Sequence, residues 1–134
     1  MSTEAAEGVK AYAREIGFDL VGITAADAFP EEEARLGSWV EAGMHGAMGY
    51  VAEHAPRAAR PAEVVPGARS AVVVAMAYRW DPEAPEDGRL RGRISAYAWG
   101  TDYHLVMEQR LAQLSEFLMA RGARVARYYV DTGP

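Results

Sequence analysis

The first 25 residues carry the hydrophobic pattern of a helix followed by a strand. Apolar side chains three or four residues apart fall on one face of a helix expected from about residue 3 to residue 16: Val9, Tyr12, Ala13 and Ile16. Gly17 comes next, and glycine readily takes the left-handed conformation that commonly ends a helix. The largely apolar run at 19–24 then predicts a short strand.

A second helix is predicted to begin at Pro30. Proline suits the first turn of a helix, where its missing N–H costs least, and three glutamates follow at 31–33, where negative charge suits the helix dipole. The inner face of this helix consists of Leu36, Trp39 and Val40. We expect a further short helix at 46–53 and an irregular connector, rich in proline, at 56–67.

The second half of the chain holds the longest apolar patterns. Residues 71–78 are continuously apolar, with three valines in a row, as in a strand that is covered on both faces. Asp102 is a candidate N-cap for a long helix at 103–121. The apolar stripe of that helix consists of Met107, Leu111, Leu114, Phe117 and Leu118. A last strand is predicted at 125–130, and a weaker pattern suggests another at 94–97.

Helices that alternate with at least three strands predict an α/β fold, a layered sandwich of a central mixed sheet flanked by helices. The 134 residues suit one domain, and 50% hydrophobic with 25% charged residues is an ordinary globular balance. The net charge of −5 argues against a free-standing nucleic-acid-binding protein, because binding to a polyphosphate depends on positive charge.

The absence of cysteine excludes disulfides and cysteine-ligated iron–sulfur clusters within these residues. The polar, acidic first residues do not form a signal peptide, and the apolar run at 71–78 is too short to cross a bilayer. A cytoplasmic protein with no membrane partner is expected, while its oligomeric state is not defined. The sequence stops at Asp131-Thr132-Gly133-Pro134, where Gly-Pro should begin a new turn or helix, so we expect a truncated domain.

Four segments contain residue types that could carry chemistry. Dense glycines at 43–50 surround His45, and they suit either close approach to a bulky ligand or a simple turn with core methionines. Arg57 begins an arginine-containing loop that suits phosphate or carboxylate binding, or is merely solvated. The aromatic segment at 94–104 ends at a helix N-terminus, and its rings offer flat faces to a ligand or pack in the core. Asp131 follows a predicted strand, as functional carboxylates do in α/β folds, or it simply makes a turn.

Common catalytic signatures do not occur in the sequence. It has neither a Walker-type phosphate loop nor a G-x-S-x-G elbow. His45, His54 and His104 are not spaced as a metal-binding pair on one helix, so no metal ligand is assigned to this chain.

Taken together and in order, these segments resemble the epoxyqueuosine reductases. The resemblance rests on Gly-Phe-Asp-Leu-Val-Gly-Ile at 17–23, Gly-x-His-Gly-x-Met-x-Tyr at 43–50, Pro-Gly-Ala-Arg-Ser at 66–70, Tyr-Ala-x-Gly-x-Asp-Tyr-His at 97–104 and Asp-Thr-Gly-Pro at 131–134. The segments at 97–104 and 131–134 are the most specific, and the resemblance extends over nearly the whole chain from about residue 5.

The resemblance implies an N-terminal, cobalamin-binding domain at 1–134 with a flavin-reductase-like, or nitroreductase-like, α/β layout. It implies that the parent enzyme, an oxidoreductase, reduces the epoxide of epoxyqueuosine in tRNA to queuosine. It places two [4Fe–4S] clusters in a ferredoxin-like domain beyond the present sequence. Without those clusters we expect this chain to be inactive alone. The alternatives are a stand-alone corrinoid carrier, a flavin-dependent enzyme of nitroreductase type, or an interaction domain without a cofactor.

The resemblance also assigns candidate roles to individual residues. Asp131 corresponds to the proposed proton donor of the family. Tyr97, Asp102, Tyr103 and His104 become candidate cobalamin contacts, and His45 and Arg57 are weaker candidates for contact with cofactor or substrate.

Overall fold

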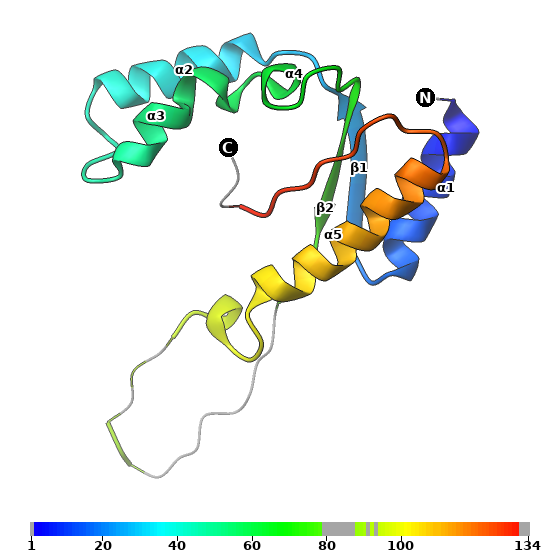
Figure 1. The fold of residues 1–134 in the computed structure, drawn as a ribbon. Coiled ribbons are helices and arrows are strands. Elements are labelled where there is room, and N and C mark those ends of the chain that lie inside the picture. The colour runs from blue at the N-terminus through cyan, green and yellow to red at the C-terminus, as the bar shows by residue number, and fades with distance from the viewer. Residues whose placement is uncertain (1, 79–87, 91, 93, 132–134) are drawn as a thin grey trace. The chain divides into compact units, whose positions relative to one another are not determined.

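The structure is a computed structural model, and it describes residues 2–78, 88–90, 92 and 94–131. In chain order the elements are α1 (Thr3–Glu15), β1 (Leu20–Ala25), α2 (Pro30–Glu41), α3 (Gly49–Ala58), α4 (Pro61–Val64), β2 (Ser70–Ala75), the 3₁₀ helix η1 (Ala96–Ala98) and α5 (Tyr103–Ala120) (Figure 1). The chain forms two compact units. Unit 1 contains the residues up to Val21 together with Val74–Val130, and unit 2 contains Gly22–Val73 together with Asp131.

The core of unit 1 lies where α1 packs against α5. Both helices bury the faces that their apolar spacing predicts, and Phe18, just after α1, is buried with them. The buried helix residues are Val9, Ala13, Leu111 and Leu114. The rings of Tyr12 and Phe117 stack between the helices, with centroids 3.9 Å apart and planes 5° apart. The predictions of an N-terminal helix and a long helix after Asp102 are therefore confirmed.

Side-chain caps define where these two helices begin. The Ser2 hydroxyl accepts a hydrogen bond from the backbone N–H of Ala5 at 3.3 Å, and Asp102 accepts one from the backbone N–H of His104 at 2.9 Å. Each cap satisfies a donor that the first turn of a helix leaves without a partner. The residue type at position 102 thus sets where α5 begins. The candidate segment at 97–104 ends in the first turn of this helix.

β1 and β2 pair in a two-stranded antiparallel sheet. Just outside the strand ends, the backbone N–H of Asp19 donates to the carbonyl oxygen of Ala75 at 3.0 Å. At the other end, the N–H of Ala26 donates to the carbonyl of Arg69 at 3.2 Å. The Asp19 carboxylate also accepts from the backbone N–H of Ala77 at 2.7 Å, which holds the chain as it leaves β2. The α/β class is confirmed, with these two strands in the part of the chain that the structure describes.

Three expectations about strands are wrong. The segment at 125–130 forms no strand, because its backbone finds no neighbouring strand to pair with among the described residues. Residues 96–98 form a 3₁₀ turn in place of the weak strand at 94–97. β2 is also not covered on both faces, since Val73 is 61% exposed. A continuous apolar run predicts burial, but it does not say which segment supplies the cover.

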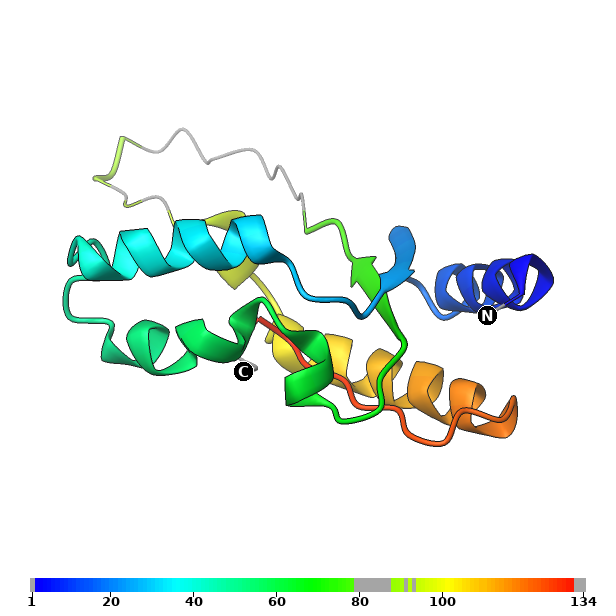
Figure 2. The same ribbon diagram turned by 90° about the horizontal axis from the view of Figure 1, so that it is seen from above.

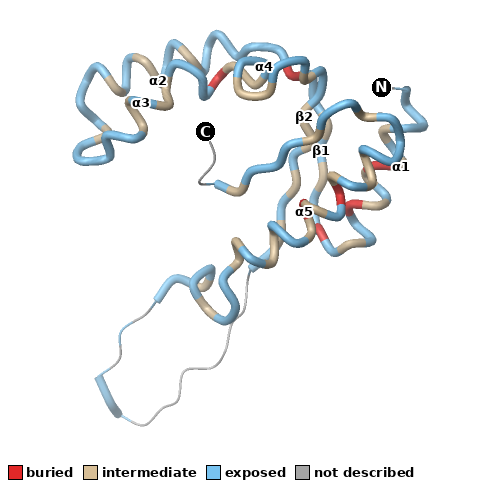
Figure 3. The backbone as a smooth tube through the Cα atoms, viewed as in Figure 1, coloured by how far each residue is buried: buried red, intermediate tan, exposed pale blue. Residues whose placement is uncertain are grey.

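Unit 2 is a helical hairpin with very little buried apolar surface. α2 and α3 lie side by side in both views of the ribbon (Figures 1 and 2), and α4 follows directly. Neither α2 nor α3 contains a buried residue, as the blue and tan colouring of both helices shows (Figure 3). The buried apolar residues of this unit are Ala26 and Ala59, both small.

The helix predicted from Pro30 is confirmed, but the boundaries after it are shifted. The short helix expected at 46–53 runs from Gly49 to Ala58 and contains Pro56, and the expected connector includes α4. Pro61 opens α4 at its first position, where proline is well tolerated. Among the described residues, no helix is both long and apolar enough to span a membrane.

The turn after α1 depends on Gly17 and on Arg110 of α5. Gly17 has φ +100°, a conformation that side chains rarely adopt, and a Cβ at this position would lie 2.9 Å from the Arg110 guanidinium. That guanidinium donates to the carbonyl oxygen of Gly17 and lies 3.2 Å from the sulfur of Met76. One arginine in the middle of α5 thereby joins that helix to the turn after α1 and to the chain after β2.

We expect Gly17→Ala to lower the free energy of unfolding by about 1–2 kcal/mol, because a Cβ is strained at positive φ. The matched control is Gly8→Ala, since Gly8 lies within α1 with open space around its Cβ position. That change should stabilise the protein by about 0.5–1 kcal/mol. Urea unfolding followed by tyrosine and tryptophan fluorescence measures both. Equal effects of the two substitutions would contradict the role given to Gly17.

Candidate functional site

Four aromatic side chains of unit 1 form a continuous group, which we call the tyrosine cluster: Tyr78, Tyr97, Tyr103 and His104. The ring of Tyr97 meets those of Tyr78 and Tyr103 edge to face, at centroid distances of 6.4 and 6.1 Å. Tyr103 stacks on His104 at 4.1 Å. Its members come from the segment that follows β2, from the 3₁₀ helix η1 and from the first turn of α5. The fold therefore brings together side chains that lie up to 26 positions apart in the sequence.

The tyrosine cluster leaves aromatic surface accessible. Tyr78 is 66% exposed and Tyr97 is 53% exposed, whereas Tyr103 and His104 are half-buried. Edge-to-face contacts hold the rings in defined orientations, and aromatic faces bind flat ligands through dispersion. The cluster is suited to contact a macrocycle or a base.

Asp102 fixes one end of this cluster. Its Oδ1 lies 2.9 Å from the backbone nitrogen of His104 and 2.9 Å from the ring Nδ1 of the same residue. Hydrogen bonds from the His104 backbone N–H and ring hold the pKa of Asp102 below its usual value. The carboxylate is thus ionised near neutral pH, and it both caps α5 and contacts the imidazole.

His45 lies in the glycine-rich loop between α2 and α3. Gly43 and Gly46 on either side of it have φ of +68° and +56°, so the turn that was one of the two alternatives for this segment is present. The expectation that its two methionines lie in the core is wrong, since they are 65% and 44% exposed. The ring is 6.2 Å from that of Trp39, and its Nδ1 is enclosed without a hydrogen-bond partner in the described structure. A buried polar nitrogen in this state is costly, and a donor from a ligand would satisfy it.

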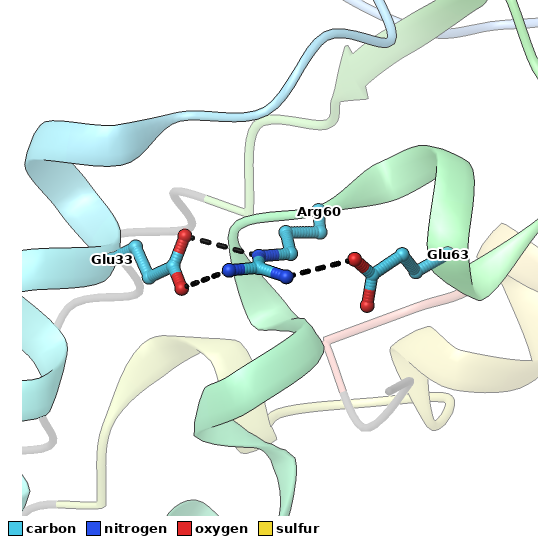
Figure 4. A network of polar contacts seen from close by, with 3 residues as sticks. All are labelled: Glu33, Arg60 and Glu63. Atoms are coloured by element: carbon cyan, nitrogen blue, oxygen red, sulfur yellow. Dashed lines mark hydrogen bonds and ion pairs between the residues drawn. The ribbon is translucent and has the colours of Figure 1, made fainter.

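The arginine loop of unit 2 binds carboxylates of its own chain. Arg60 donates from Nε to Glu33 at 3.1 Å and from Nη2 to the same carboxylate at 2.7 Å, and it donates from Nη1 to Glu63 at 2.9 Å (Figure 4). These contacts raise the pKa of Arg60 and, through the hydrogen bonds from Arg60, lower that of Glu33. Arg60 therefore links α2 to α4. The sequence had also predicted that this loop could bind phosphate. The side chain of Arg57 is exposed on α3 and makes no hydrogen bond or ion pair with the described residues.

Asp131 is exposed, in a turn that directly follows the extended segment at 125–130. The rest of its motif, at 132–134, lies outside the described residues. Asp131, His45 and Arg57 belong to unit 2, whereas the other four candidates lie together in unit 1.

The tyrosine cluster and Asp102 together make five residues. The sequence predicted four of them as candidate site residues and missed Tyr78. The available signal was its position at the end of the apolar run at 71–78, where a tyrosine leaves the strand. In the part of the chain that the structure describes, no three His, Asp or Glu side chains are grouped in a way that could hold a metal ion.

The family model described as "Epoxyqueuosine reductase QueG, DUF1730" matches residues 58–132, which is more than half of the chain. The matched stretch includes the tyrosine cluster and Asp131. The chain therefore belongs to the epoxyqueuosine reductase family.

Individual relatives extend the similarity over nearly all of the chain. Epoxyqueuosine reductases from Gloeobacter violaceus and Xanthomonas campestris are 43% and 40% identical, over 94% and 98% of this chain. The chain spans only 39% and 38% of their lengths.

Solved structures agree in fold. That of epoxyqueuosine reductase from Streptococcus thermophilus has a TM-score of 0.78 at 26% identity, with 99% of this chain and 36% of that chain covered. A second epoxyqueuosine reductase, solved with an epoxyqueuosine-modified tRNA-Tyr stem loop, has a TM-score of 0.75 at 30% identity, with 97% and 35% covered. A third, from Bacillus subtilis, is described with its aspartate-bearing catalytic loop swung out of the active site, at a TM-score of 0.66 and 28% identity over 90% of this chain and 33% of that one.

We expect Glu33→Gln to make the thermal midpoint of unfolding depend less on pH in the acidic range. Because the pKa of Glu33 is lowered in the folded state, its contribution is present above the ordinary value of about 4.5 and is lost as the pH falls through the folded value. The variant should have a lower thermal midpoint than the original chain at pH 7, and the difference should shrink below about pH 4.5. Circular dichroism melts from pH 7 to pH 3 measure it.

Glu31→Gln is the control for this experiment, because Glu31 pairs with Arg35 at 3.6 Å with both side chains more than three-quarters exposed. Such surface pairs contribute little to stability. If both variants lose stability equally at pH 7, the Arg60 link is no stronger than a surface pair.

Proposed function

We propose that this chain is the cobalamin-binding part of an epoxyqueuosine reductase, which reduces the epoxide of epoxyqueuosine in tRNA to queuosine. The observation that carries the proposal is the family match over residues 58–132, which contains both the tyrosine cluster and Asp131. A neighbour at 30% identity is described in complex with a modified tRNA stem loop, which supports tRNA as the substrate of the whole enzyme. Because this chain spans under two-fifths of the length of the Xanthomonas and Gloeobacter relatives, the complete reaction is assigned to the parent protein.

The proposal includes a layout for that parent protein. Residues 1–134 would contribute to a nitroreductase-like layered sandwich, in which β1 and β2 are two strands of a larger sheet. The exposure of Val73 on β2 supports this, since a β-branched strand face is normally covered. The [4Fe–4S] clusters would lie in a following ferredoxin-like domain, because this chain has no cysteine to ligate them.

The residues of the tyrosine cluster fit a corrinoid. Tyr78 and Tyr97 expose ring surface that a large, flat and mostly apolar macrocycle would cover. Tyr103 and His104 supply polar atoms at the edge of that surface. When bound, the corrinoid supplies a cobalt centre that carries electrons to the epoxide, and the protein supplies position, orientation and exclusion of water.

Asp131 is the proposed proton donor. Opening an epoxide leaves a negatively charged oxygen, and a nearby carboxylic acid can protonate it as the charge develops. The Bacillus subtilis neighbour is described with its aspartate-bearing catalytic loop swung out of the active site, and this supports the role because Asp131 lies in an exposed turn. His45 and Arg57 remain proposed contacts for cofactor or substrate.

Titration of the purified chain with cobalamin, followed by its visible spectrum and by co-elution in gel filtration, tests the cofactor proposal. We expect binding that Tyr97→Ala and His104→Ala each weaken by about 10-fold, the effect of losing one well-packed polar or aromatic contact. Tyr128→Ala is the control, since Tyr128 is exposed outside the cluster. Binding of flavin mononucleotide in place of cobalamin would favour the flavin enzyme, and binding of neither would favour an interaction domain.

Asp131→Asn, introduced into the full-length enzyme, tests the proton donor. We expect turnover to fall by about 10²–10⁴-fold, the usual contribution of a general acid, with cobalamin affinity unchanged. A single-turnover assay of queuosine formation measures the chemical step. Full activity of the variant would show that another group supplies the proton.

A further inference from the structure

A run of arginines follows α5 in unit 1. From position 121 to position 130 the chain has three arginines and no carboxylate, whereas the net charge of the whole chain is −5. We call these residues the arginine strip: Arg121, Arg124 and Arg127. All three are exposed, and among the described residues no carboxylate pairs with them. Positive charge that the protein itself does not neutralise is available to an anionic ligand.

One arginine of the strip is held in a defined orientation. The guanidinium carbon of Arg121 lies 3.5 Å from the centroid of the Phe117 ring, and that ring stacks on Tyr12 of α1. A stacked guanidinium keeps its N–H donors in its own plane, where they match two oxygens of a phosphate. Because the stack already orders the side chain, less rotamer freedom is lost on binding. The packing of α1 on α5 thus orients Arg121 for an anion.

Exposed aromatic rings lie next to the strip in the chain. Tyr128 and Tyr129 follow Arg127 directly and are 42% and 48% exposed. Arginine contacts to phosphates, combined with the stacking of unpaired bases on aromatic rings, are a common way for proteins to bind RNA loops. An acidic protein would use the arginines but would not need the rings. The combination therefore favours RNA as the partner.

We propose that the arginine strip contacts phosphates of the RNA substrate of the parent enzyme. This inference rests on the proposed function, which makes tRNA that substrate. Asp131, the proposed proton donor, follows Arg127 by four residues. Four residues of chain span at most about 14 Å, so Arg127 can contact the RNA backbone next to a nucleotide that reacts at Asp131. Such contacts position a nucleic acid without reading its bases.

Binding of a fluorescent tRNA stem-loop RNA to the full-length enzyme, measured by anisotropy from about 50 to 200 mM salt, tests the strip. We expect Arg121→Gln, Arg124→Gln and Arg127→Gln each to weaken binding by about 10-fold at the lowest salt. Each should also lower the slope of log affinity against log salt by about 0.7–0.9, because one phosphate contact fewer releases fewer counterions. Arg121→Lys should keep the slope but lose affinity, since an ammonium group cannot make the bidentate contact.

Arg35→Gln is the matched control. It removes the same charge from an exposed arginine, but one that already pairs with Glu31 at 3.6 Å, so affinity and slope should not change. Circular dichroism melts show whether each variant is folded. Arg124→Gln and Arg127→Gln keep the test valid if loss of the Phe117 contact destabilises Arg121→Gln, because both side chains are exposed.

Unchanged affinity and slope in the triple variant would overturn the proposal. An equal loss in Arg35→Gln would also overturn it, because overall charge alone would then decide binding. Lower melting temperatures with normal RNA binding would assign the arginines to the C-terminal end of α5, where cations interact favourably with the helix dipole. If the unaltered full-length enzyme binds no RNA, the proposed function itself fails, and the strip has no partner of this kind.

Discussion

The packing of α1 on α5 is the contact on which unit 1 depends. It buries leucines of α5 against Val9 and Ala13, and each such leucine contributes about 1.5–3 kcal/mol when fully buried. Arg110 extends the contact to the turn at Gly17 and to the chain after β2. The tyrosine cluster is built on the first turn of α5, so its geometry follows from the same packing. A site that needs oriented rings thus rests on the best-packed part of the described chain.

Unit 2 is held by a different kind of interaction. Its buried residues are alanines, and the larger side chains of α2 and α3 keep part of their surface in water. Polar contacts provide the specificity instead: Arg60 joins Glu33 to Glu63, and the N–H of Phe29 donates to the carbonyl of Ala59 at 2.9 Å. Such contacts define geometry well but offer little free energy when they are exposed. The loop with His45 therefore sits on a support that salt and pH can weaken.

Helices were predictable from the sequence because their signals are local. Spacing placed Tyr12 and Phe117 on inner faces, and Asp102 marked the start of α5 from its own residue type. Strands were less predictable, because a strand needs a neighbour that the local pattern does not reveal, and the segment at 125–130 has none among the described residues. The family segments identified Tyr97, Tyr103 and His104, but no local pattern could show that Tyr78 joins them or that Arg60 pairs with Glu33. Both depend on distant parts of the chain meeting in space.

The order of the elements has a consequence for synthesis on the ribosome. α1 is made before its partner α5, which begins about 100 residues later. At about 5–20 residues per second, α1 waits for some seconds with its apolar face uncovered. Unit 2 emerges in between, but the buried apolar residues among its described positions are two alanines, so it offers little core that could fold first. During this interval the apolar face of α1 is exposed surface of the kind that favours aggregation.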